Sequence, residues 1–263
     1  MPGSGFWKSK PPPGVPLDWG HPLVQGLVCA FPYNEGGGVP VDHVTERIPE
    51  ALPTIDPYAW TARSPYGVTF DPKPGASGTV YLIGTTLRPI INKPLTIALG
   101  YTPRATDQWL YSIGSAGGLR SLIHCRINST SLDFNLWVDD LNVTGVTNAT
   151  DEFMSFICRL ADDGTQSIYK NGAFVGSRAA GGLYAGTDRF DIGRRIDQGG
   201  SANGHFSYFY VWDRALSEQE IAELHADPYQ MFAPPVWRRY FVPAGGAPAA
   251  TLRRYSLPLT GVG

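Results

Sequence analysis

Three glutamates near the carboxyl end have a spacing that suggests paired-carboxylate chemistry. Glu218, Glu220 and Glu223 lie within six residues, and hydrolysis of a glycosidic bond needs two carboxyl groups about 5–5.5 Å apart in retaining enzymes. Ser217 and Glu220, however, have the spacing of a capping box, which predicts the start of a helix. We therefore assign Glu220 to the helix cap and Glu223 to the solvent, and we expect no enzyme.

Pairs of acidic residues also occur at 139–140, 151–152 and 162–163. Neighbouring side chains on a strand point to opposite faces, so such a pair acts together only in a loop. A loop that holds Asp139, Asp140 and Asn142 would offer several oxygen ligands to a hard cation, and calcium is therefore the one cofactor with a candidate site. No other metal or cofactor is expected, because the chain has no HxxxH, HExxH or CxxC spacing.

Sugar binding uses a different set of side chains, namely an exposed aromatic face beside a few amide or carboxylate groups. The candidates are Tyr58, Trp60, Tyr66, Trp109 and Trp137. The competing interpretation is that the tryptophans of a β-rich domain pack between its sheets. The sequence alone leaves both interpretations open.

The composition indicates many short strands joined by tight turns. Glycine (31) and proline (23) make about a fifth of the 263 residues, and 43% of the residues are hydrophobic. A net charge of −2 gives no reason to expect nucleic acid or an acidic membrane surface as a partner. We expect no membrane span, because no run of about 18 apolar residues occurs, and no signal peptide, because the amino terminus has no apolar core.

Local patterns place the strands of the central part of the chain. In LTIALGYTPR, Leu95, Ile97 and Leu99 alternate with small or polar residues, which predicts a half-buried strand. Strands at 153–160, 167–170 and 173–178 are separated by Asp163-Gly164 and Asn171-Gly172, and these turn pairs predict a three-stranded meander.

The run HFSYFYVW predicts a strand that is apolar on both faces. Phe206, Tyr208, Tyr210 and Trp212 form one face, and we expect the other to include Phe209. One face should contact the opposite sheet, and the second should be covered by the following helix, by a terminal arm or by a second subunit. The helix should end at Asp227-Pro228.

Both ends of the chain differ from the middle. We expect a proline-rich arm at 1–22, a single domain at 23–232 and a basic, Pro/Gly-rich arm at 233–263, both arms being extended. Aromatic and arginine side chains are enriched at the centres of interfaces. The expected anchors are Trp7, Trp19, Trp237, Arg238, Arg239, Tyr240, Arg253, Arg254 and Tyr255.

The run GHFSYFYVWDRALSEQEIAEL resembles the closing strand and helix of the concanavalin A-like, laminin G-like jelly-roll family. The matching residues are Gly204, Phe206, Phe209, Val211, Trp212, Arg214, Ala215, Leu216, Ser217 and Ile221. SIYKNGAFVGS resembles a hairpin of that family, FDIGRR its isoleucine-glycine strand and GLVCAFPYNEGGG its first strand. The resemblance implies an all-β fold, a two-sheet antiparallel β-sandwich with one short carboxyl-terminal helix. Ser207 and Tyr208 replace an acidic pair of the family, so no calcium site is implied on this strand.

HPLVQGLVCAFPYNEGGG and ADPYQMFAPP resemble the versions of this domain found in virion proteins of tailed bacteriophages. This implies a non-enzymatic structural virion protein, which would be a capsid decoration protein, a head fibre or a tail component. It would lie on the virion surface after assembly in the host cytoplasm. Its partners would be major capsid or tail proteins and further copies of itself. The alternative is a lectin-type adhesion module that binds cell-surface glycans.

Overall fold

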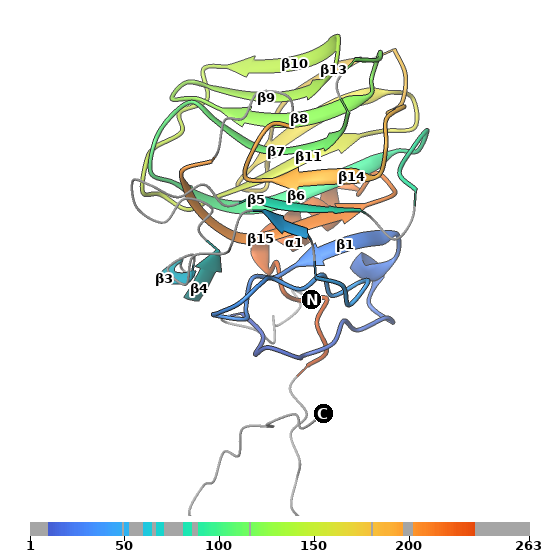
Figure 1. Cartoon of the computed structure of the whole chain (residues 1–263). Coiled ribbons are helices and arrows are strands. Elements are labelled where there is room, and N and C mark those ends of the chain that lie inside the picture. Colours follow the sequence, from blue (N-terminus) through green and yellow to red (C-terminus); the bar gives the residue numbers. More distant parts are fainter. Residues whose placement is uncertain are drawn as a thin grey trace, which may run out of the picture.

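The computed structural model is a sandwich of two antiparallel sheets, as the sequence predicts (Figure 1). Its description covers residues 10–48, 50–52, 60–64, 67–70, 81–85, 89–115, 117–179, 181–196 and 202–234. Every strand pair between the sheet elements of these residues is antiparallel.

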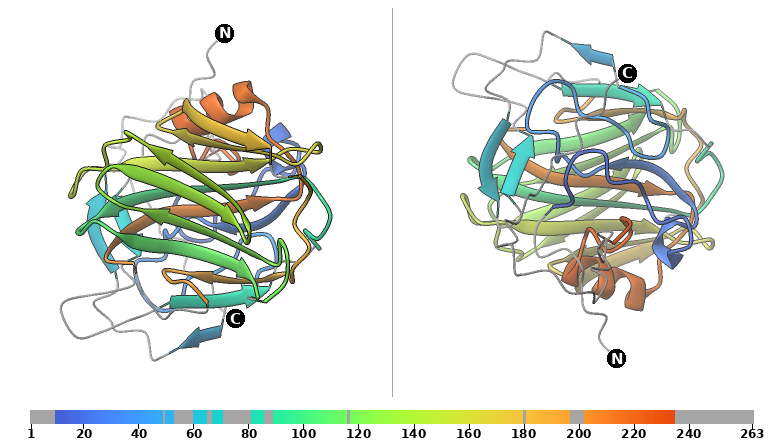
Figure 2. Two further views of the ribbon diagram at one scale, coloured as in Figure 1. Left: turned by 90° about the horizontal axis from the view of Figure 1, so that it is seen from above. Right: turned by 90° about the horizontal axis from the view of Figure 1, so that it is seen from below.

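The larger sheet has eight strands and contains the predicted meander. Its order is β13 (Ala173–Ala179), β12 (Thr165–Lys170), β11 (Met154–Leu160), β6 (Leu95–Pro103), β15 (Gly204–Trp212), β4 (Gly67–Phe70) and β3 (Trp60–Ser64), and β1 (Leu27–Phe31) also pairs with β15. Strand β15 is central because it pairs with β6 along one edge and with β1 and β4 along the other. Figure 2 shows it crossing the middle of the sandwich.

The smaller sheet has seven strands. Its order is β10 (Asp139–Thr144), β9 (Ser131–Leu136), β8 (Leu122–Ile127), β7 (Gln108–Gly114), β14 (Arg189–Ile192), β5 (Tyr81–Thr85) and β2 (Glu50–Leu52). Alternate residues of β8 and β9 enter the core between the sheets, namely Ile123, Cys125, Ile127, Leu132, Phe134 and Leu136. The residues between them therefore lie on the outer face of this sheet.

The outer face of the larger sheet is closed by segments from both ends of the described chain. Tyr208, Tyr210 and Trp212 form a second buried cluster with side chains of the amino-terminal segment and of helix α1 (Glu218–Ala226). The Trp212 Nε1 atom donates to the carbonyl of Leu23, in the short 3₁₀ helix η1 (Pro22–Val24), at 2.6 Å. Of the three predicted covers, the helix and the amino-terminal segment are therefore both present.

Two details of this cover correct the sequence prediction. Strand β6 is buried along its whole length rather than on one face, because the second cluster covers its outward residues. A β-bulge between Phe206 and Tyr208 shifts the alternation of β15. Phe206 therefore lies in the core between the sheets with Phe209, and not on the face of Tyr208 as predicted.

Helix α1 begins with the predicted capping box. The Ser217 hydroxyl accepts from the Glu220 backbone N–H, and the Glu220 carboxylate accepts from the Ser217 N–H and from Arg214. Its buried residues Ile221 and Leu224 seal the second cluster. Among the described residues, no helix has the length and apolar character needed to cross a membrane.

Candidate functional site

The outer face of the smaller sheet carries two rows of polar side chains. Residues that face each other across antiparallel strands lie on the same side of a sheet. The first polar row is Asp191, Ser112, His124, Asn135 and Asp140, and it crosses β14, β7, β8, β9 and β10. The second polar row is Trp109, Arg126, Asp133 and Asn142, across β7 to β10. Trp137 follows Asn135 by two residues and extends the same face.

The segment after β14 carries a cation over this face. The buried Asp191 carboxylate pairs with Arg194 at 2.6 Å and with Arg189 at 3.2 Å. The Ser112 hydroxyl accepts from the Ile196 backbone N–H at 3.0 Å and donates to the Arg194 carbonyl at 3.3 Å. Because Arg195 lies between the two backbone groups that Ser112 holds, its side chain has a fixed origin above the sheet.

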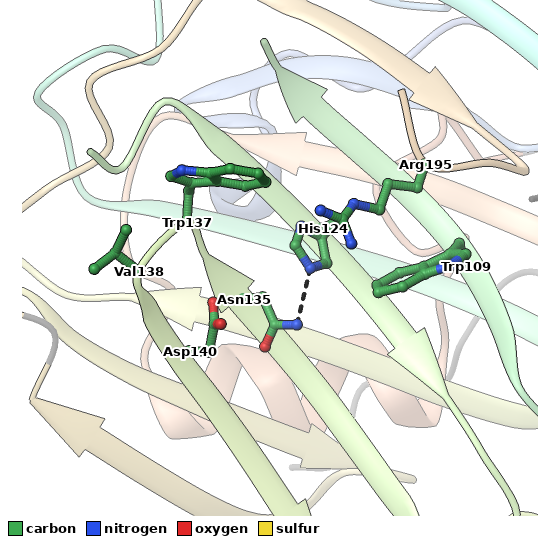
Figure 3. A pocket seen from close by; sticks show the side chains of 7 residues that line it. All are labelled: Trp109, His124, Asn135, Trp137, Val138, Asp140 and Arg195. Atoms are coloured by element: carbon green, nitrogen blue, oxygen red, sulfur yellow. Dashed lines mark hydrogen bonds between the residues drawn. The ribbon is translucent and has the colours of Figure 1, made fainter. Parts of the chain in front are cut away.

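Arg195 completes a small cleft between the two tryptophans (Figure 3). Its guanidinium carbon lies 4.8 Å from the centre of the Trp109 ring and 5.6 Å from that of Trp137. This tryptophan cleft has a volume of about 240 Å³. It is lined by Trp109, His124, Asn135, Trp137, Val138, Asp140 and Arg195. Aromatic faces, amide and carboxylate acceptors and a guanidinium donor are the groups that a polyhydroxylated ligand requires.

The two tryptophans have different surroundings within the tryptophan cleft. Trp109 packs edge-to-face against His124 and has a second guanidinium, that of Arg126, 5.1 Å from its ring centre. Trp137 lies in the two-residue turn between β9 and β10, beside Val138, which is 67% exposed. Trp137 therefore lies at an exposed turn, whereas Trp109 is held among side chains of the sheet.

The turn that presents Trp137 is strained. Val138 has φ +81°, a backbone conformation that a β-branched residue adopts rarely. Glycine or asparagine would satisfy this position at a lower conformational cost. Strain of this kind is concentrated at functional sites, where the surrounding structure maintains it.

The electrostatics of the cleft are set by its arginines. Burial, together with the charges of Arg195 and Arg126, lowers the pKa of His124 to about 3, so this imidazole is neutral at physiological pH. Its Nε2 atom is 2.8 Å from Asn135 Nδ2 and accepts from it in the neutral form. Desolvation raises the pKa of Asp140, and the positive charges of Arg178 and Arg195 oppose this rise. Asn135 Oδ1 has no hydrogen-bond donor among the described residues.

The structure brings together two of the five aromatic residues predicted to bind sugar. Trp109 and Trp137 line the tryptophan cleft. Trp60 instead packs against the core between the sheets, and its Nε1 atom donates to the Gly38 carbonyl at 2.9 Å. Tyr58 and Tyr66 lie outside the described residues.

The loop required by the calcium hypothesis is a strand. Asp139, Asp140 and Asn142 belong to β10, where Asp139 points to the opposite face from the other two. The Asp139 carboxylate pairs with Arg120 at 2.6 Å, and Asn142 donates to Asp133. The three side chains therefore do not converge on one point. No cluster of histidine, cysteine or acidic residues suited to a metal occurs in the part of the chain that the structure describes.

One of the nine predicted arm anchors, Trp19, belongs to the described residues. Trp7, Trp237, Arg238, Arg239, Tyr240, Arg253, Arg254 and Tyr255 lie outside the described residues. Trp19 is described and is 61% exposed. Its neighbour Leu17 is buried and bridges to Phe232, so part of the predicted amino-terminal arm packs on the sandwich. The domain boundary at residue 23 stays a prediction.

Comparison with known proteins identifies the class of protein. Residues 74–222, more than half of the chain, match the family described as the Concanavalin A-like lectin/glucanases superfamily, and the chain therefore belongs to this family. No curated protein sequence matches the chain.

Solved structures agree on the fold. The binding domain of Paraclostridial Mosquitocidal Protein 1 aligns with a TM-score of 0.58 at 11% identity, over 77% of this chain and 52% of that one. Domain 4 of AbnA, an extracellular arabinanase from Geobacillus stearothermophilus solved with arabinotriose, aligns with a TM-score of 0.57 at 12% identity, over 76% of this chain and 98% of that domain. The binding domain of botulinum neurotoxin DC, solved with rat synaptotagmin II, aligns with a TM-score of 0.54 at 13% identity, over 77% and 51%. The chain thus spans about half of each toxin binding domain.

Proposed function

We propose that the protein is a non-catalytic glycan-binding module that uses the tryptophan cleft. The observation that carries this proposal is the guanidinium of Arg195 held between Trp109 and Trp137, next to the acceptors of Asn135 and Asp140. The similar folds of toxin binding domains and of an arabinanase domain solved with arabinotriose support it.

Each group of the cleft has a role in this proposal. The apolar face of a sugar ring stacks on Trp137, as sugar C–H groups do on aromatic rings. The Asp140 carboxylate and Asn135 Oδ1 accept hydrogen bonds from hydroxyl groups, and Arg195 donates to ring or hydroxyl oxygens. The volume of about 240 Å³ is smaller than the 300–1,000 Å³ or so of typical drug-sized sites, so the cleft accommodates about one sugar ring.

A glycan array followed by calorimetry tests this proposal. We expect Trp137→Ala and Asp140→Asn each to weaken binding of the selected glycan by about tenfold, which corresponds to about 1.4 kcal/mol. Trp19→Ala removes an exposed tryptophan outside the cleft and is the matched control, with unchanged affinity expected. Failure of a broad array to yield a specific glycan, or binding that survives both cleft substitutions, would refute the proposal.

We also propose that this module is displayed on a tailed-phage particle. The resemblance of the segments around residues 21–38 and 226–235 to phage virion proteins supports this setting. Mass spectrometry of purified particles is the test. Stoichiometric recovery of the chain with the particles is expected, and its consistent absence from intact particles would contradict the virion role while leaving the glycan proposal standing.

A further inference from the structure

A second and larger cleft lies where the amino-terminal segment crosses the body of the protein. Its volume is about 480 Å³. This amino-terminal cleft is lined by Pro13, Gly14, Val15, Pro16, Leu17, Trp19, Asn34, Glu35, Val41, His43, Val44, Thr45 and Glu46. It shares no residue with the tryptophan cleft. It is therefore a separate candidate site.

The cleft contains buried acceptors that lack donors. Glu35 Oε1 accepts from the Val41 backbone N–H at 2.8 Å, but Glu35 Oε2 has no donor among the described residues. Asn34 is 7% exposed, and its Oδ1 atom has no donor in this part of the chain either. A buried acceptor without a donor is destabilising, so a ligand that donates hydrogen bonds here would recover the lost free energy.

The charge of the cleft favours a cation. Glu35 and Glu46 are its ionisable acids, and neither lysine nor arginine lines it. A nearby cation is the buried ammonium of Lys10, which donates to the Tyr33 carbonyl at 2.8 Å and opposes the rise in the pKa of Glu35. Desolvation lowers the pKa of His43, so this side chain adds no positive charge at neutral pH. Desolvation also raises the pKa of Glu35, and a bound cation would favour its ionised form.

The walls of the cleft favour a cation that is attached to apolar groups. Val15, Val41 and Val44 are half-buried, and Pro13 and Pro16 flank them. Trp19 is 61% exposed, so its ring is available to contact a guanidinium or another aromatic ring. An arginine-containing peptide with aromatic neighbours combines these features.

The described chain ends beside this cleft. The Ala233 backbone N–H donates to the carbonyl of Pro16, a wall residue, at 2.9 Å. Phe232 bridges to Leu17 and packs edge-to-face on His43, with the ring centres 5.4 Å apart. In Figure 1 the blue amino-terminal segment and the end of the described carboxyl-terminal segment lie close together.

The sequence that follows has the required chemistry. Trp237, Arg238 and Arg239 lie outside the described residues, four to six positions after Ala233. An extended chain covers about 3.3 Å per residue, so these side chains are within about 13–20 Å of the Pro16 wall. A tether of this length gives an effective concentration in the millimolar range.

We propose that the amino-terminal cleft binds the Trp237-Arg238-Arg239 segment of the same chain, with an arginine guanidinium donating to Glu35 and Asn34. This interaction goes beyond the glycan site and does not depend on it.

A labelled peptide of residues 235–243 tests the proposal by fluorescence anisotropy. The proteins are the full chain and the full chain with Arg238→Ala and Arg239→Ala, whose own segment no longer competes. We expect the double variant to bind the peptide at least tenfold more tightly than the unaltered chain, and Glu35→Gln added to it to weaken binding about tenfold. Glu218→Gln, an exposed acid on α1, is the matched control and leaves binding unchanged.

Three results would overturn the proposal. The first is equal peptide affinity for the unaltered chain and the double variant. The second is peptide binding that survives both Glu35→Gln and Trp19→Ala; the second substitution is at an exposed residue and spares the fold. The third is a concentration-dependent dimer of the full chain that the arginine substitutions abolish, because the segment would then bind another copy.

Discussion

Leu17→Ala tests whether the amino-terminal segment is a structural part of the sandwich. Leu17 is 4% exposed, belongs to the cluster that covers the outer face of the larger sheet, and bridges to Phe232. The adjacent Asp18 N–H donates to the Met231 carbonyl at 2.9 Å, so the segment is also fixed by its backbone. A shorter side chain at this position therefore leaves a void beneath a backbone that is held in place.

The expected cost follows from that geometry. Replacing a buried leucine by alanine destabilises proteins by about 2–5 kcal/mol, depending on how far the site collapses. The segment is peripheral and relaxes more easily than a strand between two sheets, so we expect about 2.5 kcal/mol. For a domain of this size that corresponds to a decrease in Tm of about 5–10 °C.

Urea denaturation and thermal melting of the full chain measure this effect. Leu119→Ala, at a leucine that is 56% exposed, is the control, with a change below about 0.5 kcal/mol expected. Ile221→Ala removes a side chain from the same cluster on the helix and should also be strongly destabilising. If Leu17→Ala had no effect while Ile221→Ala were costly, the segment would not be seated as described.

Three further predictions concern titration and strain. The His124 ring should show no NMR titration above pH 4, and a titration midpoint near 6.5 would contradict its burial. Because its folded pKa of about 3 lies below the unfolded value, the free energy of unfolding should decline as the pH falls below about 6.5. Val138→Asn should raise the free energy of unfolding by about 1 kcal/mol in urea titrations by relieving the positive φ, and a loss of stability would contradict the assigned strain. Desolvation opposes ionisation of Glu220, but bonds from Arg214 and Ser217 lower its pKa overall, so Glu220→Gln should lower Tm at pH 7, and the loss should shrink as the pH falls below the unfolded value of 4.5; a loss that does not change with pH would contradict this.

The fold was predictable because its signals are local. The turn pairs Asp163-Gly164 and Asn171-Gly172 determine the meander without information from distant residues, and the structure places β11, β12 and β13 within two residues of the predicted strands. The capping box of Ser217 and Glu220 is equally local. Burial on the outer face of β6 was not predictable, because the covering residues come from both ends of the described chain.

The candidate site was only partly predictable because it depends on strand register. Trp109 and Trp137 were candidates by residue type, but nothing local separates them from Trp60, which packs on the core. His124 and Asn135 become neighbours only when β8 pairs with β9. The polar alternation within those two strands was a usable signal for an outward polar face.

Arg195 is the residue that local patterns could least indicate. It lies about 60 to 85 positions from the strands that it covers, and its place depends on the bonds of Ser112 to its two neighbours.

The outer faces of the two sheets differ in how far other segments of the described chain cover them. The outward aromatic residues of the larger sheet pack against α1 and the amino-terminal segment, so that face is buried inside the protein. The smaller sheet instead carries outward polar rows and the strained turn at Val138, neither of which the core requires. Buried polar side chains such as His124 reduce stability unless they are paired, and residues with that cost are expected where a surface is organised for recognition. This difference between the two outer faces is a further argument for the glycan proposal on β7 to β10.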